Sequence, residues 1–180
     1  FKPFIGKTVR AVKVHANMSK GFHEKLLKFA TGIGMGGLGY HEVLEDKSYK
    51  GPIDKFIPDD MKAEFMELAG LEVGDTIFFM ADKEERAAFY AGQIRTELGE
   101  KLDLIEKNAY RFCYVNDFPM FERDPETKKI GFTHNPFSMP QGGLEALNTM
   151  DPLDILAYQY DIVCNGIELS SGAVLTMICR

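Results

Sequence analysis

Two carboxylates flank an Asn-Gly pair late in the chain. Asp161 lies before Asn165-Gly166 and Glu168 lies after it, each within an apolar run. Asn-Gly between apolar runs is the strongest short-range signal for a β-hairpin with a two-residue turn. In that register residue 163 faces 168 and residue 161 faces 170, so both carboxylates project from one face, about 7–8 Å apart between Cα atoms.

A carboxylate pair of this kind supports three kinds of chemistry. It can hold one divalent cation, because Mg²⁺ usually takes one or two protein carboxylates together with phosphate oxygens and water. It can also be a solvent-facing acidic pair, or the acid and base of a hydrolase. The residues alone leave all three open. The opposite face is expected to be an apolar core side, formed by Tyr160, Ile162, Cys164, Ile167 and Leu169.

Two further patterns suggest ligands. His134 and Asn135 open a Pro-, Gly- and Asn-containing loop that runs to about Pro152, and functional groups concentrate in such loops. Gly32 to Gly37 match the string GxGxxG, but a dinucleotide site needs a strand before it and a helix after it. A helix precedes it here, so we interpret the run as a glycine-rich helix exit.

The elements that must position these residues follow from periodicity and turn signals. The first hundred residues alternate strands and helices, with Ser19 and Asp82 as expected helix N-caps. Later segments are strands, without a helix in the loop from Asn135 to Pro152. The sequence therefore predicts an α+β protein with an α/β module over residues 1–103 and a mainly antiparallel segment over 104–180. The expected elements are strands at 8–15, 37–44, 75–81, 110–116 and 129–133, two around 165–166, and helices after Ser19, at 58–69 and after Asp82.

Composition excludes several classes of protein. The chain has 180 residues, of which 45% are hydrophobic and 27% charged, an ordinary globular balance. No apolar run approaches the roughly 18 residues of a membrane span, and no leader opens the chain, so we expect a soluble, cytoplasmic protein with no membrane partner. Three scattered cysteines without a CxxC pair argue against a disulfide framework or a zinc site, and buried or free thiols are expected.

The charge is unevenly distributed. The net charge is −6, which argues against a nucleic-acid partner on average. Residues 1–30, however, carry seven basic side chains against the single acid Glu24. This stretch is either a solvated face or a phosphate-facing patch. The basic residues are Lys2, Lys7, Arg10, Lys13, Lys20, Lys25 and Lys28.

Three separated motifs resemble the segment that leads into motif 3 of bacterial-type aspartyl-tRNA synthetases, which are class II enzymes. They are Asn116–Glu122, His134–Pro140 and Tyr160–Leu169. Upstream, Gly51–Phe56 and Asp75–Asp82 resemble the GAD insertion domain of the same family. The resemblance extends over nearly the whole chain up to Val174 and is strongest to alphaproteobacterial or organellar members.

The resemblance implies ATP-dependent activation of aspartate to aspartyl-adenylate and its transfer to tRNA-Asp, with tRNA-Asn as a further candidate, by a homodimeric parent enzyme. Asp161 and Glu168 match the acidic pair that binds ATP through Mg²⁺. His134 and Asn135 match the polar pair of the loop that closes over aspartate and ATP. Lys20, Lys25 and Lys28 are the candidate tRNA-facing residues.

The chain departs from the family pattern at its end. Leu175 stands where the family has the motif 3 arginine that grips ATP, and the match is lost from Leu175 to Arg180. Motif 1, the motif 2 arginine and the anticodon-binding barrel are also absent. The chain is therefore expected to be a fragment that alone neither forms adenylate nor charges tRNA, and we assign it no catalytic residue.

Two alternatives remain. The chain could be a non-catalytic GAD module that contacts RNA or acts as a scaffold, or a degenerate standalone paralogue of the synthetase. The synthetase-type segments around His134 and from Asp161 to Glu168 favour the ligase fragment. The genomic sequence on either side of the reading frame would separate the three.

Overall fold

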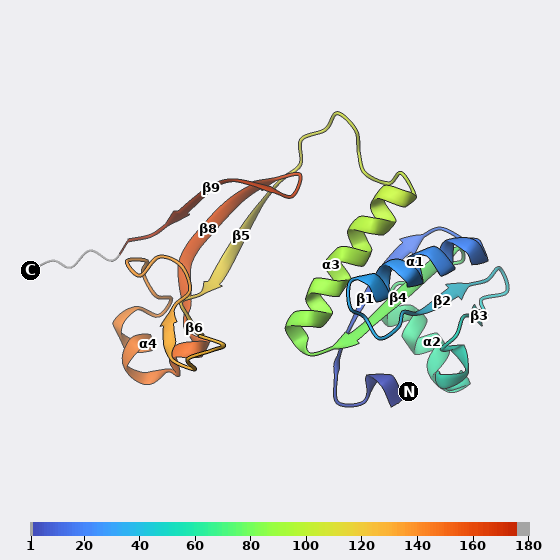
Figure 1. Cartoon of the computed structure of the whole chain (residues 1–180), viewed down its shortest axis with the longest axis horizontal. Coiled ribbons are helices and arrows are strands. Elements are labelled where there is room, and N and C mark those ends of the chain that lie inside the picture. The colour runs from blue at the N-terminus through green and yellow to red at the C-terminus, as the bar shows by residue number, and fades with distance from the viewer. Residues whose placement is uncertain (1, 176–180) are drawn as a thin grey trace, which may run out of the picture. The chain divides into compact units, whose positions relative to one another are not determined.

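A computed structural model describes residues 2–175. The chain divides into two compact units, the first ending at Ile105 and the second beginning at Glu106. Both contain antiparallel sheets, and the first also carries the long helices, so the predicted α+β class is confirmed (Figure 1). Among the residues described, no helix combines the length and apolar character that crossing a membrane requires.

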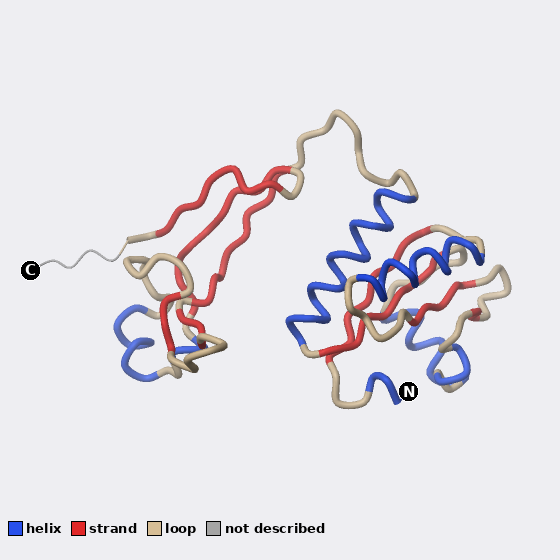
Figure 2. The backbone as a smooth tube through the Cα atoms, viewed as in Figure 1, coloured by secondary structure: helices blue, strands red, loops and turns tan. Residues whose placement is uncertain are grey.

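The first unit is a four-stranded antiparallel sheet with helices on both faces. The strand order is β1-β4-β2-β3, and the unit also contains three α-helices and two short 3-10 turns (Figure 2). In chain order the elements are a 3-10 turn at Lys2–Phe4, β1 (Thr8–His15), α1 (Lys20–Gly32), β2 (Gly39–Val43), β3 (Tyr49–Lys50), a 3-10 turn at Asp54–Phe56, α2 (Asp59–Leu68), β4 (Asp75–Asp82) and α3 (Glu84–Lys101).

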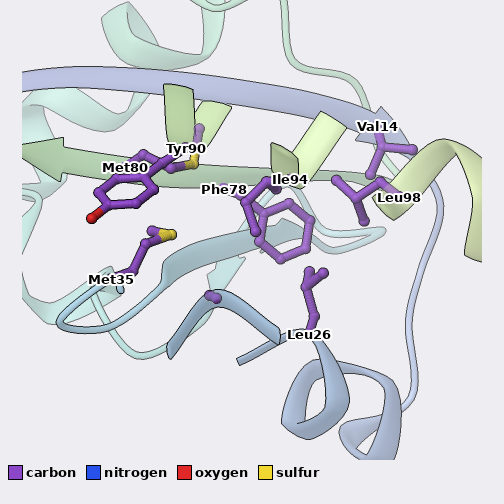
Figure 3. Packing of buried hydrophobic residues seen from close by; sticks show 9 residues of the cluster. Val14, Leu26, Met35, Phe78, Met80, Tyr90, Ile94 and Leu98 are labelled. Carbon is purple, nitrogen blue, oxygen red and sulfur yellow. The ribbon is translucent and has the colours of Figure 1, made fainter. Parts of the chain in front are cut away.

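Strand β4 is central because it is apolar on both sides. Phe78 and Met80 point into a cluster with α1 and α3, where Leu26, Ile94 and Leu98 are almost fully buried (Figure 3). Ile77 and Phe79 belong to a second cluster on the other face, against which Phe65 and Met66 of α2 pack. A strand that is covered on both faces needs a continuous apolar run rather than alternation.

Of the two helix N-caps predicted from the sequence, one is confirmed. Ser19 caps α1 as predicted, because its Oγ accepts a hydrogen bond from the Phe22 amide at 3.3 Å. The prediction that Asp82 caps α3 is wrong, since the N-cap is Lys83. Asp82 stays in β4, opposite Thr8, and its carboxylate accepts a hydrogen bond from the Lys83 amide at 2.8 Å.

The glycine run after α1 is a helix exit, as predicted. Gly34 adopts φ +97°, and its amide bonds to the Thr31 carbonyl while the Met35 amide bonds to the Ala30 carbonyl. This pair of bonds is the Schellman arrangement, which closes a helix with a left-handed glycine. Strand β2 follows at Gly39 rather than a helix, so the run lacks the setting of a dinucleotide fingerprint.

The second unit contains a three-stranded antiparallel sheet of order β5-β8-β9 and a separate β6-β7 hairpin. The prediction of an irregular loop from Asn135 to Pro152 is partly wrong, because Gly143–Thr149 forms the short helix α4 behind the left-handed Gly142. The elements are β5 (Phe112–Pro119), β6 (Phe121–Arg123), β7 (Ile130–Phe132), α4, a 3-10 turn at Pro152–Asp154, β8 (Leu156–Cys164) and β9 (Ile167–Ala173).

Candidate functional site

The Asn165-Gly166 turn is held by more than its own backbone. Both residues have positive φ, +51° and +80°, as a two-residue hairpin turn of this type requires. The Asn165 side chain accepts a hydrogen bond from the Arg111 amide at 2.9 Å and donates one to the Ala109 carbonyl at 2.8 Å. The turn that positions both carboxylates is thereby tied to the chain entering β5.

The predicted hairpin forms, but its register shifts part of the way along. Cys164 faces Ile167 and Val163 faces Glu168, as predicted. Beyond Glu168 a β-bulge intervenes, so Asp161 faces Ser171, and the predicted pairing of 161 with 170 is wrong. The extra residue is Leu169, which lies between the paired Glu168 and Ser170 and has no opposite partner.

The bulge leaves Asp161 and Glu168 on one face of the sheet. Residues opposite each other in an antiparallel pair share a face, so Glu168 lies on the side of Val163 and hence of Asp161. Asp161 is half-buried and Glu168 is exposed. Within residues 2–175 neither carboxylate has an ion-pair partner, so the oxygens of both are available as ligands.

The opposite face is less buried than expected. Cys164 is buried and Ile162 is half-buried, but Tyr160, Ile167 and Leu169 are 42%, 67% and 58% exposed. The prediction of an apolar core side is therefore wrong for these three side chains. The described part of the chain packs little against them, and the bulge removes Leu169 from the regular alternation.

A buried amide ties the His134–Asn135 loop to the carboxylate face. Gln159 is 6% exposed and precedes Asp161 by two residues on β8, so the two side chains share a face. Its Nε2 donates to the Ser138 hydroxyl at 2.7 Å and to the Asn135 carbonyl at 3.4 Å. Asn135 therefore lies on the Asp161 side of the sheet.

His134 is exposed and stands edge-on to the Phe118 ring, 5.3 Å between centroids. Ser138, which the Gln159 amide contacts, is fully buried. Gln159 and Ser138 were not among the predicted site residues. The sequence held one signal for Gln159, which is a polar residue two positions before Asp161 in an otherwise apolar strand and so falls on the same face.

The loop also joins the sheet through its backbone. The Met139 amide bonds to the Val174 carbonyl at 2.7 Å, and the Tyr158 amide bonds to the Met139 carbonyl at 2.9 Å. Ser138 forms an isolated bridge with Leu175, the residue that the resemblance predicts to stand at the position of the motif 3 arginine. The rest of the non-matching tail, residues 176–180, lies outside the described residues.

The residues present fit a phosphate-bridged Mg²⁺ better than a protein-only metal cage. Within residues 2–175 no group of three or more His, Cys, Asp and Glu side chains gathers as a metal site. Mg²⁺ usually binds one or two protein carboxylates, and phosphate oxygens and water fill the rest of its octahedron. The two carboxylates on this face match that number. Cys113 and Cys164 are free thiols, as expected, and Cys179 is outside the described residues.

The three candidate tRNA-facing lysines belong to the outer side of α1. Lys20, Lys25 and Lys28 are all exposed, whereas His23, Leu26 and Ala30 of the same helix are buried. Lys20 makes a long contact of 3.9 Å with Glu24. The side of α1 that faces away from the sheet is therefore predominantly basic.

Comparisons with known proteins find a domain family and several relatives that the chain resembles. Residues 3–91 match the family model of the GAD domain. The chain is 53% identical over 171 residues to the aspartate–tRNA(Asp/Asn) ligase of Ehrlichia canis (strain Jake), which covers 94% of the chain and 29% of that relative. It is also 53% identical to the ligase of the same name from Gluconobacter oxydans (strain 621H). That match covers 94% of the chain and 28% of the relative.

The relative from Rickettsia felis (strain ATCC VR-1525 / URRWXCal2) has the same name and is 49% identical over 175 residues, which is 94% of the chain and 29% of the relative. The chain thus spans less than a third of the length of these relatives. The similarity extends well beyond residue 91, into the second unit with the candidate site. The chain is thus similar over 94% of its length to a stretch of these aspartate–tRNA(Asp/Asn) ligases, and its residues 3–91 match the GAD domain.

Proposed function

We propose that this chain is part of an aspartate–tRNA ligase, in which the longer protein activates aspartate with ATP and transfers it to tRNA. The observation that carries the proposal is the arrangement on one sheet face of Asp161, Glu168 and, through Gln159, the His134–Asn135 loop. The names of the relatives support tRNA-Asp and tRNA-Asn as acceptors. A homodimeric parent and a cytoplasmic location complete the proposal, with GAD and catalytic parts at residues 1–103 and 104–180.

In this proposal Asp161 and Glu168 hold Mg²⁺ together with ATP phosphate oxygens. The ion, when bound, would neutralise phosphate charge while the aspartate carboxylate attacks the α-phosphate of ATP, so that aspartyl-adenylate forms and pyrophosphate leaves. His134 and Asn135 would close over aspartate and ATP, and the Gln159 amide would keep their loop at the carboxylate face. Positioning and electrostatics therefore account for what these residues contribute.

Substituting the carboxylates tests this assignment. In the longer protein, Asp161→Asn and Glu168→Gln should each lower aspartate-dependent pyrophosphate exchange by about 100-fold, because a charge that binds the metal–phosphate group is removed. Glu126→Gln, in the exposed turn after Asp124, is the matched control and should leave the rate unchanged. Wild-type rates in both site variants would contradict the assignment. Exchange by the 180-residue chain alone would contradict the expectation that this stretch is catalytically incomplete.

A second experiment tests the α1 lysines. Reversing the charge of Lys20, Lys25 and Lys28 in the longer protein should weaken tRNA binding and flatten the dependence of log K on log salt, by about 0.7–0.9 for each phosphate that is no longer neutralised. Reversing the exposed Lys50, Lys55 and Lys129 changes the net charge equally and serves as the control. Equal affinity and slope in both triple variants would assign the α1 lysines to ordinary solvated surface.

A further inference from the structure

A cavity of about 440 Å³ lies in the first unit, beyond the start of β2. β1 pairs with β4 through Asp82, whereas β2 pairs with β4 only from Thr76 to Phe79. The last residues of β4 therefore lack a partner on the β2 side, and the neighbouring loops border a partly open space there. Figure 3 shows Met35 and Tyr90, two of its lining residues, at one end of the core cluster.

Most of the side chains that line the cavity are apolar. The Gly36-Gly37 backbone forms part of the lining, so the run that closes α1 also borders the cavity. Pockets of about 300–1,000 Å³ with apolar walls and a few polar groups are the usual form of small-molecule sites. Six of the apolar side chains in the lining are Phe4, Met35, Leu38, Pro52, Ile53 and Phe79.

The polar groups at the cavity favour an anion. Lys7 is exposed, and within residues 2–175 no carboxylate pairs with its ammonium group. The Gly36 and Gly37 amides likewise have no acceptor among the described residues. Free backbone amides beside a cation are a common way to hold phosphate or carboxylate groups.

The single carboxylate of the lining is already compensated. Asp82 lies 3.6 Å from the Arg86 guanidinium and accepts a hydrogen bond from the Lys83 amide at 2.8 Å. Arg86 in turn donates to the Tyr90 hydroxyl, which donates to the Gly34 carbonyl. Lys7 is thus left as the uncompensated charge at the cavity.

We propose that this cavity is a binding site for a small organic anion that carries a phosphate or carboxylate on a flat, largely apolar ring. The ring lies against the apolar walls, and the anionic group meets Lys7 and the Gly36 and Gly37 amides. The site shares no residue with the carboxylate face of the second unit and is independent of the ligase assignment. Its glycines contribute amides after a helix, so it differs from a dinucleotide fingerprint.

The test is a titration of the isotopically labelled 180-residue chain, followed by the NMR amide signals of Gly36 and Gly37. The probes are adenosine 5′-monophosphate, phenyl phosphate, benzoate, adenosine and inorganic phosphate. At least one probe with both a ring and an anionic group should shift these signals saturably. Adenosine and inorganic phosphate, which each lack one part, should bind at least about tenfold more weakly. The three ring anions distinguish a nucleotide from a simpler aromatic phosphate or carboxylate.

Lys7→Met keeps most of the aliphatic stem and removes the charge, so it should weaken binding about tenfold. Lys129→Met makes the same change at an exposed site in the second unit, outside the cavity, and should leave binding unaltered. The unperturbed amide signals of the other residues verify that each variant is folded. The proposal is overturned if no ring anion gives saturable shifts at millimolar concentration, or if Lys7→Met binds as tightly as Lys129→Met.

Discussion

The His41→Phe variant should be insensitive to one source of acid destabilisation. Between pH 7 and pH 4 the unsubstituted chain should lose about 3 kcal/mol of unfolding free energy through His41, and the variant should not show this loss. The His41 side chain is fully buried, and neither ring nitrogen has a hydrogen-bond partner in the described structure. Its ring packs between Tyr49, at 5.4 Å, and Phe79, at 5.7 Å between centroids.

Burial lowers the pKa of His41 from 6.5 to about 4, because the imidazolium would lose its hydration there. Among its charged neighbours, Asp54 opposes this shift and Lys62 reinforces it. The unfolded chain therefore binds more protons than the folded chain between pH 6.5 and about 4. The stability that the neutral His41 side chain contributes is fully present above pH 6.5. It is lost as the pH falls through this window, at about 1.4 kcal/mol per pH unit.

Urea unfolding at a series of pH values from 7 to 4 measures this effect. Other groups also titrate in acid, so the quantity to compare is the difference between each variant and the unsubstituted chain. His41→Gln is the matched control, because it keeps a polar side chain but cannot titrate. In both variants the part of the pH dependence of the unfolding free energy that comes from His41 should be absent, whatever their stability at pH 7. Stability curves that stay parallel to the unsubstituted chain would show that His41 does not titrate on unfolding.

Replacing Glu42 with leucine should lower the unfolding free energy by about 3 kcal/mol, because it breaks a buried polar pair. Glu42 Oε1 lies 2.8 Å from His23 Nε2, and both side chains are about 90% buried. The His23 ring is stacked on Tyr40, with 3.9 Å between centroids, so it cannot readily turn toward water. Its Nδ1 already has no partner in the described structure, and the substitution would leave Nε2 unpaired as well.

A double-mutant cycle separates this interaction from packing. Glu42→Leu and His23→Leu are each expected to destabilise the chain, and the double variant should be less destabilised than the sum of the two, since no buried polar group is then left unpaired. Glu42→Gln keeps a hydrogen-bonding side chain of the same length and should cost less than Glu42→Leu. Additive effects in the cycle would mean that the pair contributes no coupling.

Sequence-level reasoning located most elements because their signals are local. The Asn165-Gly166 turn, the Ser19 cap and the apolar run of β4 each depend on residues within a few positions. The two pairings nearest the turn were likewise predictable, because turn length sets the register there. These signals were enough to put Asp161 and Glu168 on one face.

Features that depend on distant residues escaped prediction. Nothing local signals the bulge at Leu169, the bond from Gln159 to Ser138, or the pairing of His23 with Glu42 across 19 positions. The cavity beside Lys7 exists because β2 ends its pairing with β4 at Phe79, a consequence of strand register.

The sequence by itself determined the fold class, the hairpin with its carboxylate pair, and the glycine helix exit, because propensity, turn chemistry and periodicity act over a few residues. Only the tertiary structure decided which buried polar groups find partners, where the loop of His134 and Asn135 is anchored, and which apolar faces remain exposed. Those outcomes depend on side chains that meet only when separate elements pack together, and packing is a property of the whole unit.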